Sequence, residues 1–120
     1  MSTQINPGIR RAATYSCTFT PPETPDNYSK IIITFAQGQQ IVHSFTDASD
    51  EVAVGAADIV VTLSQQQTLA FAPSFFSPMG RELKGPVYVQ CRCFKSAAAV
   101  TESQNIPIAV EDCQSEEVLS

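Results

Sequence analysis

Residues 14–20 read TYSCTFT, and this stretch decides the fold class because its side chains alternate strictly between two faces. Tyr15, Cys17 and Phe19 lie on one face, and hydroxyl-bearing residues occupy the other. A repeat of two residues is typical of a β-strand with one buried face. The stretch therefore predicts a half-buried strand over residues 14–20.

Similar strand patterns recur along the chain, and turn-forming residues separate them. We expect further strands at 29–37, 41–46, 51–54, 58–64, 86–95 and around 106–110. One short helical turn is expected near Ser64, because Ser64 and Gln67 have the spacing of a capping box. About seven short strands at roughly ten-residue spacing predict an all-β fold, an antiparallel immunoglobulin-like β-sandwich.

Length and charge limit the classes of function. The chain has 120 residues, which suits one domain, and a formal net charge of −5. An acidic protein is repelled by phosphates, so we expect no nucleic-acid partner. The first residues lack the apolar core of a signal peptide, and no run is long enough for a membrane helix. We therefore expect a soluble protein made in a cytosol, with no membrane partner.

The ends of the chain differ in charge from each other. We expect residues 1–12 to form an N-terminal arm, 13–111 the sandwich domain and 112–120 an acidic C-terminal tail. The arm carries Arg10 and Arg11, and acidic residues cluster from Glu111 onward. These charges could pair within one molecule, pair between neighbours, or remain solvated. The arm lacks an apolar run, so we expect it to be ordered only in an assembly.

The sequence offers no catalytic constellation. His43, the single histidine, precedes Ser44 in an expected strand, so the two side chains point to opposite faces. His43 shares its strand face with Ile41 and Phe45, so it is instead expected at the margin of the core. Glycine-rich phosphate loops and zinc-protease motifs are absent from the sequence. We therefore expect no enzyme activity and no cofactor.

The four cysteines are expected to be structural. Cys17 shares a face with Tyr15 and Phe19, and Cys91 and Cys93 share one with two valines, so these thiols fit a core. Zinc and a disulfide are the alternatives, although only Cys91 and Cys93 are close in sequence. DASDE at 47–51 begins like a calcium loop but lacks its glycine and distal glutamate. We expect no metal site.

Residues 72–86, APSFFSPMGRELKGP, have the composition of a loop but contain Phe75, Phe76 and Met79. The loop could fold back as a lid on the sandwich, or its apolar groups could contact a neighbouring subunit. Adjacent side chains in extended chain point opposite ways, so we expect one phenylalanine inward and one available. The candidate partner contacts are Phe75, Phe76, Met79, Arg10 and Arg11.

Four segments together resemble a known group of proteins: KIIITFAQGQQIV at 30–42, VTLSQQQTLAF at 61–71, VYVQCRCF at 87–94 and DCQSEEVL at 112–119. In this order and spacing they resemble small immunoglobulin-like virion structural proteins of tailed bacteriophages and prophages of gut bacteria. The resemblance covers about residues 10–119. The loop at 72–86 is longer than the family pattern.

The resemblance implies a virion structural protein without enzyme activity, such as a decoration, adaptor or tail/fibre-base module. Its partners would be other virion proteins, with multiple copies in a symmetric assembly, and it would reside in the host cytoplasm during assembly. The alternative is a small acidic phage-encoded inhibitor or regulator of a host protein. A carbohydrate-binding sandwich is a third option, but the chain has no tryptophan to form a sugar platform.

Overall fold

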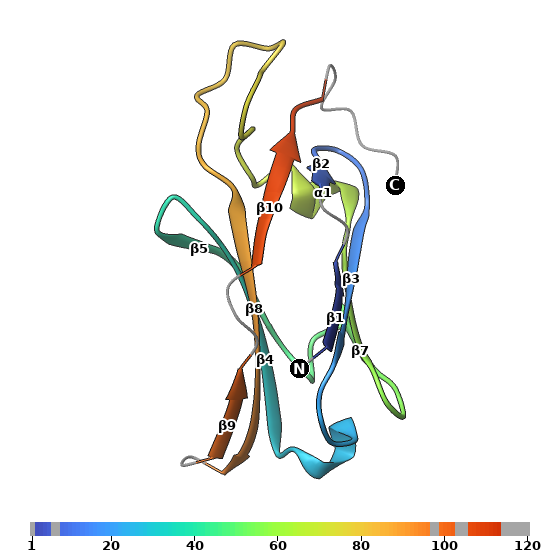
Figure 1. Cartoon of the computed structure of the whole chain (residues 1–120). Helices are drawn as coiled ribbons and strands as arrows, with labels where there is room; N and C mark the ends of the chain where they lie inside the picture. The colour runs from blue at the N-terminus through green and yellow to red at the C-terminus, as the bar shows by residue number, and fades with distance from the viewer. Residues whose placement is uncertain (1, 6–7, 97–98, 103–105, 114–120) are drawn as a thin grey trace.

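The computed structural model describes residues 2–5, 8–96, 99–102 and 106–113 as two β-sheets that pack face to face (Figure 1). The four-stranded sheet contains, in spatial order, β1 (Ser2–Ile5), β3 (Tyr15–Thr20), β7 (Ile59–Leu63) and β6 (Val52–Val54). The six-stranded sheet contains β2 (Gly8–Arg10), β10 (Ile106–Glu111), β8 (Val87–Ser96), β4 (Lys30–Gln37) and β5 (Gln40–Thr46), and β9 (Ala99–Glu102) pairs with β8.

The strand order confirms the expected all-β sandwich. The path β1-β3-β7-β6 corresponds to strands A-B-E-D of an immunoglobulin domain, and β10-β8-β4-β5 corresponds to G-F-C-C′. Every pairing in the two sheets is antiparallel except that of β2 with β10, which is parallel. The part of the chain that the structure describes also contains two short helical elements, η1 (Pro25–Asn27) and α1 (Gln65–Thr68).

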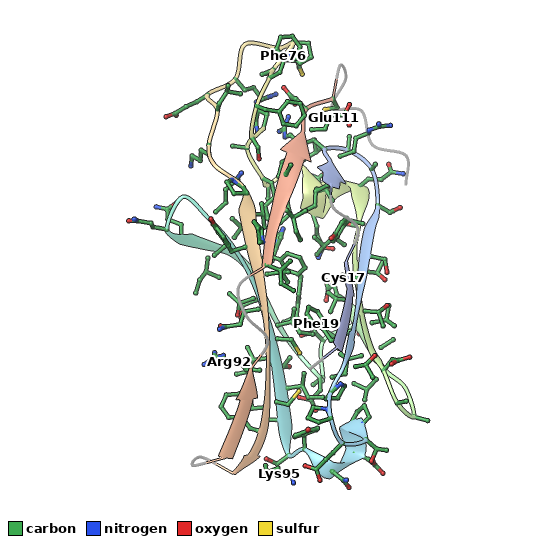
Figure 2. All side chains as sticks on the ribbon, in the orientation of Figure 1. Cys17, Phe19, Phe76, Arg92, Lys95 and Glu111 are labelled. Carbon is green, nitrogen blue, oxygen red and sulfur yellow. The ribbon has the colours of Figure 1, made fainter. Side chains whose placement is uncertain are left out.

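The core follows from the period-two pattern of the strands. Tyr15, Cys17 and Phe19 are buried as expected from TYSCTFT, and Figure 2 shows Cys17 and Phe19 between the two sheets. Alternate residues of β4, β7 and β8 meet them from the other strands. The capping box is also present: the Ser64 hydroxyl accepts from the Gln67 amide, and the Gln67 side chain accepts from the Ser64 amide.

All seven expected strands are present, and the described residues contain three further strands that were not predicted: β1, β2 and β9. Residues 2–5 pair with β3, and residues 8–10 pair with β10, so these residues belong to the sheets and not to a separate arm. Ile9 is fully buried, and burial of this side chain anchors β2. β2 has three residues and one apolar side chain, which is too short for a periodic signal, so the sequence pattern did not predict it.

The boundary expected at residue 112 is also displaced. Asp112, directly after β10, is buried, and Cys113 is half-buried. The rest of the expected tail, 114–120, lies outside the described residues. The domain therefore continues at least through Cys113 at this end.

A bulge in β5 changes the face expected for Ile41. His43 pairs with Phe35 and Ile41 pairs with Ala36, so an extra residue is inserted between these two pairs. Because of this extra residue, the Ile41 side chain does not lie on the strand face that His43 and Phe45 share. Ile41 is 68% exposed, whereas Phe45 is buried.

Candidate functional site

The loop 72–86 connects α1 to β8 and extends beyond one end of the sandwich (Figure 1). Its base is attached to β10 through Ser74. The Ser74 amide donates to the Val110 carbonyl at 2.9 Å, and the Val110 amide donates to Ser74 Oγ at 2.9 Å. The two arms of the loop also meet, because the Lys84 amide donates to the Pro73 carbonyl at 2.9 Å. The loop therefore leaves the sandwich in a defined direction.

Gln37, at the end of β4, holds both ends of the loop. Its Nε2 donates to the carbonyls of Ala72 and Gly85, at 2.8 and 3.0 Å, and its Oε1 accepts from the Ala72 amide at 2.8 Å. The Gln37 side chain is buried, so these bonds satisfy polar atoms that water does not reach. The strand parity of residues 31, 33 and 35 places Gln37 inward, and that pattern could have identified it from sequence.

Arg11 and Asp112 form a buried ion pair at the root of the loop. Arg11 Nη1 lies 2.6 Å from Asp112 Oδ1, and the two side chains are 4% and 0% exposed. Arg11 Nε donates to the Phe71 carbonyl at 2.8 Å, and Nη2 donates to the Leu69 carbonyl at 3.1 Å. One guanidinium thus joins the N-terminal segment, the chain after α1 and the end of β10.

Asp112 also binds the loop itself. The Ser77 hydroxyl donates to Asp112 Oδ2, and Ser77 Oγ accepts from the Arg81 amide at 2.9 Å. Burial by itself would raise the pKa of Asp112, but hydrogen bonds from Ser77, Arg11 and the Cys113 amide hold that pKa below its ordinary value. The carboxylate is therefore ionised and fully bonded at neutral pH. Sequence reasoning missed Ser77 and assigned Asp112 to the tail.

The far part of the loop carries the exposed apolar groups of the candidate site. Phe75 and Phe76 are 61% and 63% exposed, Met79 is 43% exposed, and Leu83, which was not predicted, is 47% exposed. The expectation that one phenylalanine points inward is wrong. Phe71 and Pro73, at the start of the loop, are buried instead. That end of the core is thus filled before the chain reaches Phe75.

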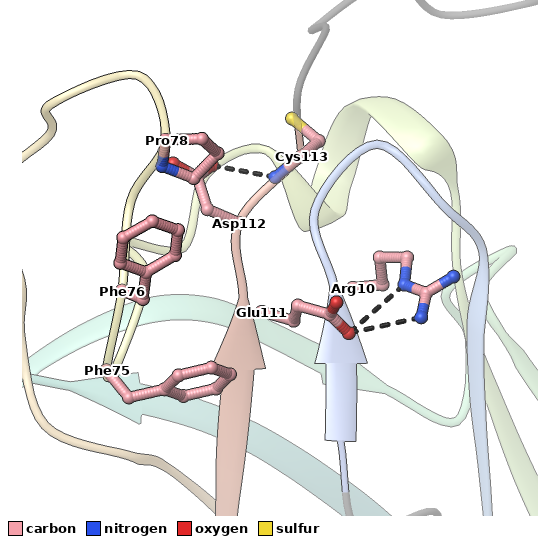
Figure 3. A pocket seen from close by; sticks show the side chains of 7 residues that line it. All are labelled: Arg10, Phe75, Phe76, Pro78, Glu111, Asp112 and Cys113. Carbon is pink, nitrogen blue, oxygen red and sulfur yellow. Dashed lines mark hydrogen bonds and ion pairs between the residues drawn. The ribbon is translucent and has the colours of Figure 1, made fainter.

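Phe75, Phe76 and Pro78 form one wall of a surface pocket of about 510 Å³, which Figure 3 shows from close by. The opposite wall consists of Arg10, Glu111, which is the last residue of β10, and the two residues that follow it, Asp112 and Cys113. Arg10 Nη2 lies 3.1 Å from Glu111 Oε2, and both side chains are largely exposed. The pocket therefore combines an aromatic wall with a solvated ion pair, a composition suited to a protein surface contact.

The structure separates the two arginines that were predicted as partner contacts. Arg10 lines the pocket, but Arg11 is buried within the fold, so its assignment as a contact is wrong. Both arginines pair with acidic residues of the same molecule, so these charges at the two ends of the chain pair within one molecule. The Arg11 side chain can be buried here because the five donors of its guanidinium can satisfy a carboxylate and several carbonyls at once.

His43 lies at the margin of the core, as predicted. Its Nε2 is 2.8 Å from the Gln67 carbonyl oxygen, and its ring stacks on Phe45 with centroids 5.8 Å apart. Ser44 is exposed on the strand next to it. Through these contacts His43 attaches β5 to α1, which is a structural role.

Three cysteines are buried as predicted: Cys17, Cys91 and Cys93. Cys17 on β3 and Cys91 on β8 occupy the two strands that antibody domains join by a disulfide, but here no disulfide joins these two cysteines. Burial raises the pKa of Cys17 to about 12. Within the part of the chain that the structure describes, no three potential ligands among His, Cys, Asp and Glu come together for a metal.

The chain matches no family model, and it matches no curated protein. Among the described residues, no helix has the length and apolar character to cross a membrane. Function must therefore be inferred from the exposed surfaces of the sandwich.

Proposed function

We propose that this protein is a structural component of a bacteriophage virion that acts through protein–protein contacts. The observation that carries the proposal is the pair Phe75–Phe76, held solvent-exposed on a loop whose base is fixed. Clustered exposed apolar side chains mark interaction sites in soluble proteins, and aromatic residues dominate the energy of such contacts.

The way the loop is held supports binding without a large entropic cost. Gln37 joins its two ends, and Asp112 binds Ser77 near the aromatic pair. A segment that is already ordered loses less conformational freedom when a partner binds. Each phenylalanine that a partner covers completely contributes about 1.5–3 kcal/mol before other costs. In a symmetric assembly this contribution is repeated in every copy.

The resemblance to small virion proteins of tailed phages supplies the context of the proposal. In that context the partners are other virion proteins, the chain is present in many copies, and it resides in the host cytoplasm before assembly. The net charge of −5 and the immunoglobulin-like order of the strands are compatible with such a module.

Mass spectrometry of purified phage particles tests the proposal. We expect the protein in intact virions at a copy number that matches the symmetry of one virion part. If the protein were absent from particles and were recovered bound to a host protein from infected cells, the proposal would be wrong. That result would support the alternative of a regulator of a host protein.

A further inference from the structure

The edge strand β5 offers a second surface, separate from the aromatic tip of the loop. It pairs with β4 on one side, and no strand among the described ranges pairs with its other side. Its sequence, QIVHSFT, contains no lysine, arginine, carboxylate or proline. Natural proteins usually protect open edges with charged residues or proline, because an open edge accepts another strand. The edge of β5 lacks both of these protections.

Hydrogen bonds at the end of β5 show which backbone groups face outward. The Asp47 amide donates to the Ile31 carbonyl of β4 at 3.1 Å, so residue 47 faces the sheet. The Thr46 amide instead donates to Ser49 Oγ at 2.9 Å, so residue 46 faces away. Backbone groups alternate along a paired strand, and Ser44 therefore also directs its amide and carbonyl outward. Ser44 is exposed, which leaves room for an incoming strand.

The charges at the two ends of β5 favour a second copy as that strand. The segment after β5, residues 47–51, is acidic, and within it Asp50 is exposed, whereas the carboxylates of Asp47 and Glu51 also accept hydrogen bonds from their own molecule. Before β5, the Lys84 side chain lies beside the turn, with its Cδ 3.5 Å from the position that a Cβ on Gly38 would occupy. When two copies of β5 pair antiparallel, the end of each strand lies opposite the start of the other. Lys84 of each copy then faces the acidic segment of the other.

The same pairing brings a second strand to an exposed apolar residue. Ile41, at the start of β5, is 68% exposed, and across Ala36 it lies level with Tyr88, which is 44% exposed. A neighbouring strand covers part of Ile41, and this burial adds to the backbone hydrogen bonds. The uncharged strand also lets two molecules of net charge −5 approach without like charges at the centre of the contact.

We propose that two copies of this protein pair antiparallel through β5 about a two-fold axis and form one continuous sheet across the dimer. This inference goes beyond the proposed function, because it requires neither a virion nor the Phe75–Phe76 pair. The contact is isologous, so each copy uses the same strand, and the aromatic loop of each copy remains available to another partner.

Sedimentation equilibrium of the purified chain tests the pairing with two variants at Ser44. Ser44→Pro removes an amide that points away from β4, and proline is tolerated in edge strands at such positions. Ser44→Ala removes the hydroxyl but keeps the amide. We expect the wild type and Ser44→Ala to dimerise, and Ser44→Pro to weaken dimerisation by at least about tenfold, since two symmetry-related hydrogen bonds are lost. A monomeric wild type, or a Ser44→Pro variant that dimerises equally well, would overturn the proposal.

A charge reversal tests the orientation without altering the strand. Lys84→Glu places a carboxylate opposite the acidic segment 47–51 of the other copy, and we expect weaker dimerisation. Combining it with Asp50→Lys restores opposite charges and is expected to recover part of the affinity. Unchanged dimerisation in Lys84→Glu would overturn antiparallel pairing through β5, even if Ser44→Pro proved to be unfolded.

Discussion

Arg11 and Asp112 are 101 residues apart in the chain, yet their side chains form a buried ion pair 2.6 Å long. The pair joins the segment after β2 to the end of β10, and both residues also bind the chain that leads into the aromatic loop. It thereby connects the N-terminal segment of the fold to the surface that we assign to partner contact.

Replacing Arg11 by methionine is expected to destabilise the protein by about 3–5 kcal/mol, because Asp112 would remain as a buried charge without its partner. Arg10→Met is the matched control. The Arg10–Glu111 pair is exposed to solvent and screened, so its loss is expected to cost less than about 1 kcal/mol. Urea denaturation of both variants measures the difference. Equal free energies of unfolding for the two variants would contradict the structural role of Arg11.

The contribution of Asp112 is expected to depend on pH. Its pKa in the folded protein is lowered, so the unfolded state binds a proton more readily than the folded state in acid. The stabilisation is fully present above the unfolded value of about 3.9 and disappears as the pH falls through the folded value. Asp112→Asn should therefore be less stable than the wild type at neutral pH, with a difference that narrows below about pH 4. Denaturation curves at pH 7 and in acid measure the stability difference between the two proteins. A difference that grows in acid would contradict the lowered pKa of Asp112.

Cys113 is expected to be the accessible thiol of the folded protein. It is half-buried beside the pocket, whereas Cys17, Cys91 and Cys93 are buried in the core, out of reach of a reagent, and burial raises the pKa of Cys17 to about 12. A thiol reagent should modify one cysteine rapidly under native conditions, and Cys113→Ser should abolish that rapid phase. Full denaturation should expose all four thiols. Rapid native labelling of Cys91 or Cys93 would contradict the strand register of β8.

Sequence reasoning recovered the parts of the structure that repeat every two residues. The alternation of TYSCTFT and VYVQCRCF indicated the faces of β3 and β8, including the three core cysteines. It missed β2 because Ile9 is its single apolar residue, and it misplaced Ile41 because a bulge shifts the register within β5. Bulges and three-residue strands depend on tertiary pairing, which local patterns do not contain.

The candidate site was predicted in part. The composition of residues 72–86 identified the loop and its apolar residues, but local geometry suggested that one phenylalanine would be buried. The structure fills the core with Phe71 and holds the loop through Gln37, Ser74 and Asp112, so both Phe75 and Phe76 stay exposed. These contacts join residues that are more than 30 positions apart in the chain, and local patterns do not contain such pairings, although strand parity places Gln37 inward.

The central claim, that the Phe75–Phe76 pair is a contact surface, is tested most directly by incorporation of variants into phage particles. Phe75→Ser and Phe76→Ser should each lower the stability of the isolated chain by at most about 1 kcal/mol, because the rings are mostly exposed. Phe71→Ser, with its buried ring, is the control for a purely structural loss. At a temperature where all chains tested are folded, we predict that Phe75→Ser or Phe76→Ser reduces the copy number per particle. Wild-type copy number for both variants, despite a lower melting temperature, would contradict the claim and show that the loop serves the fold alone.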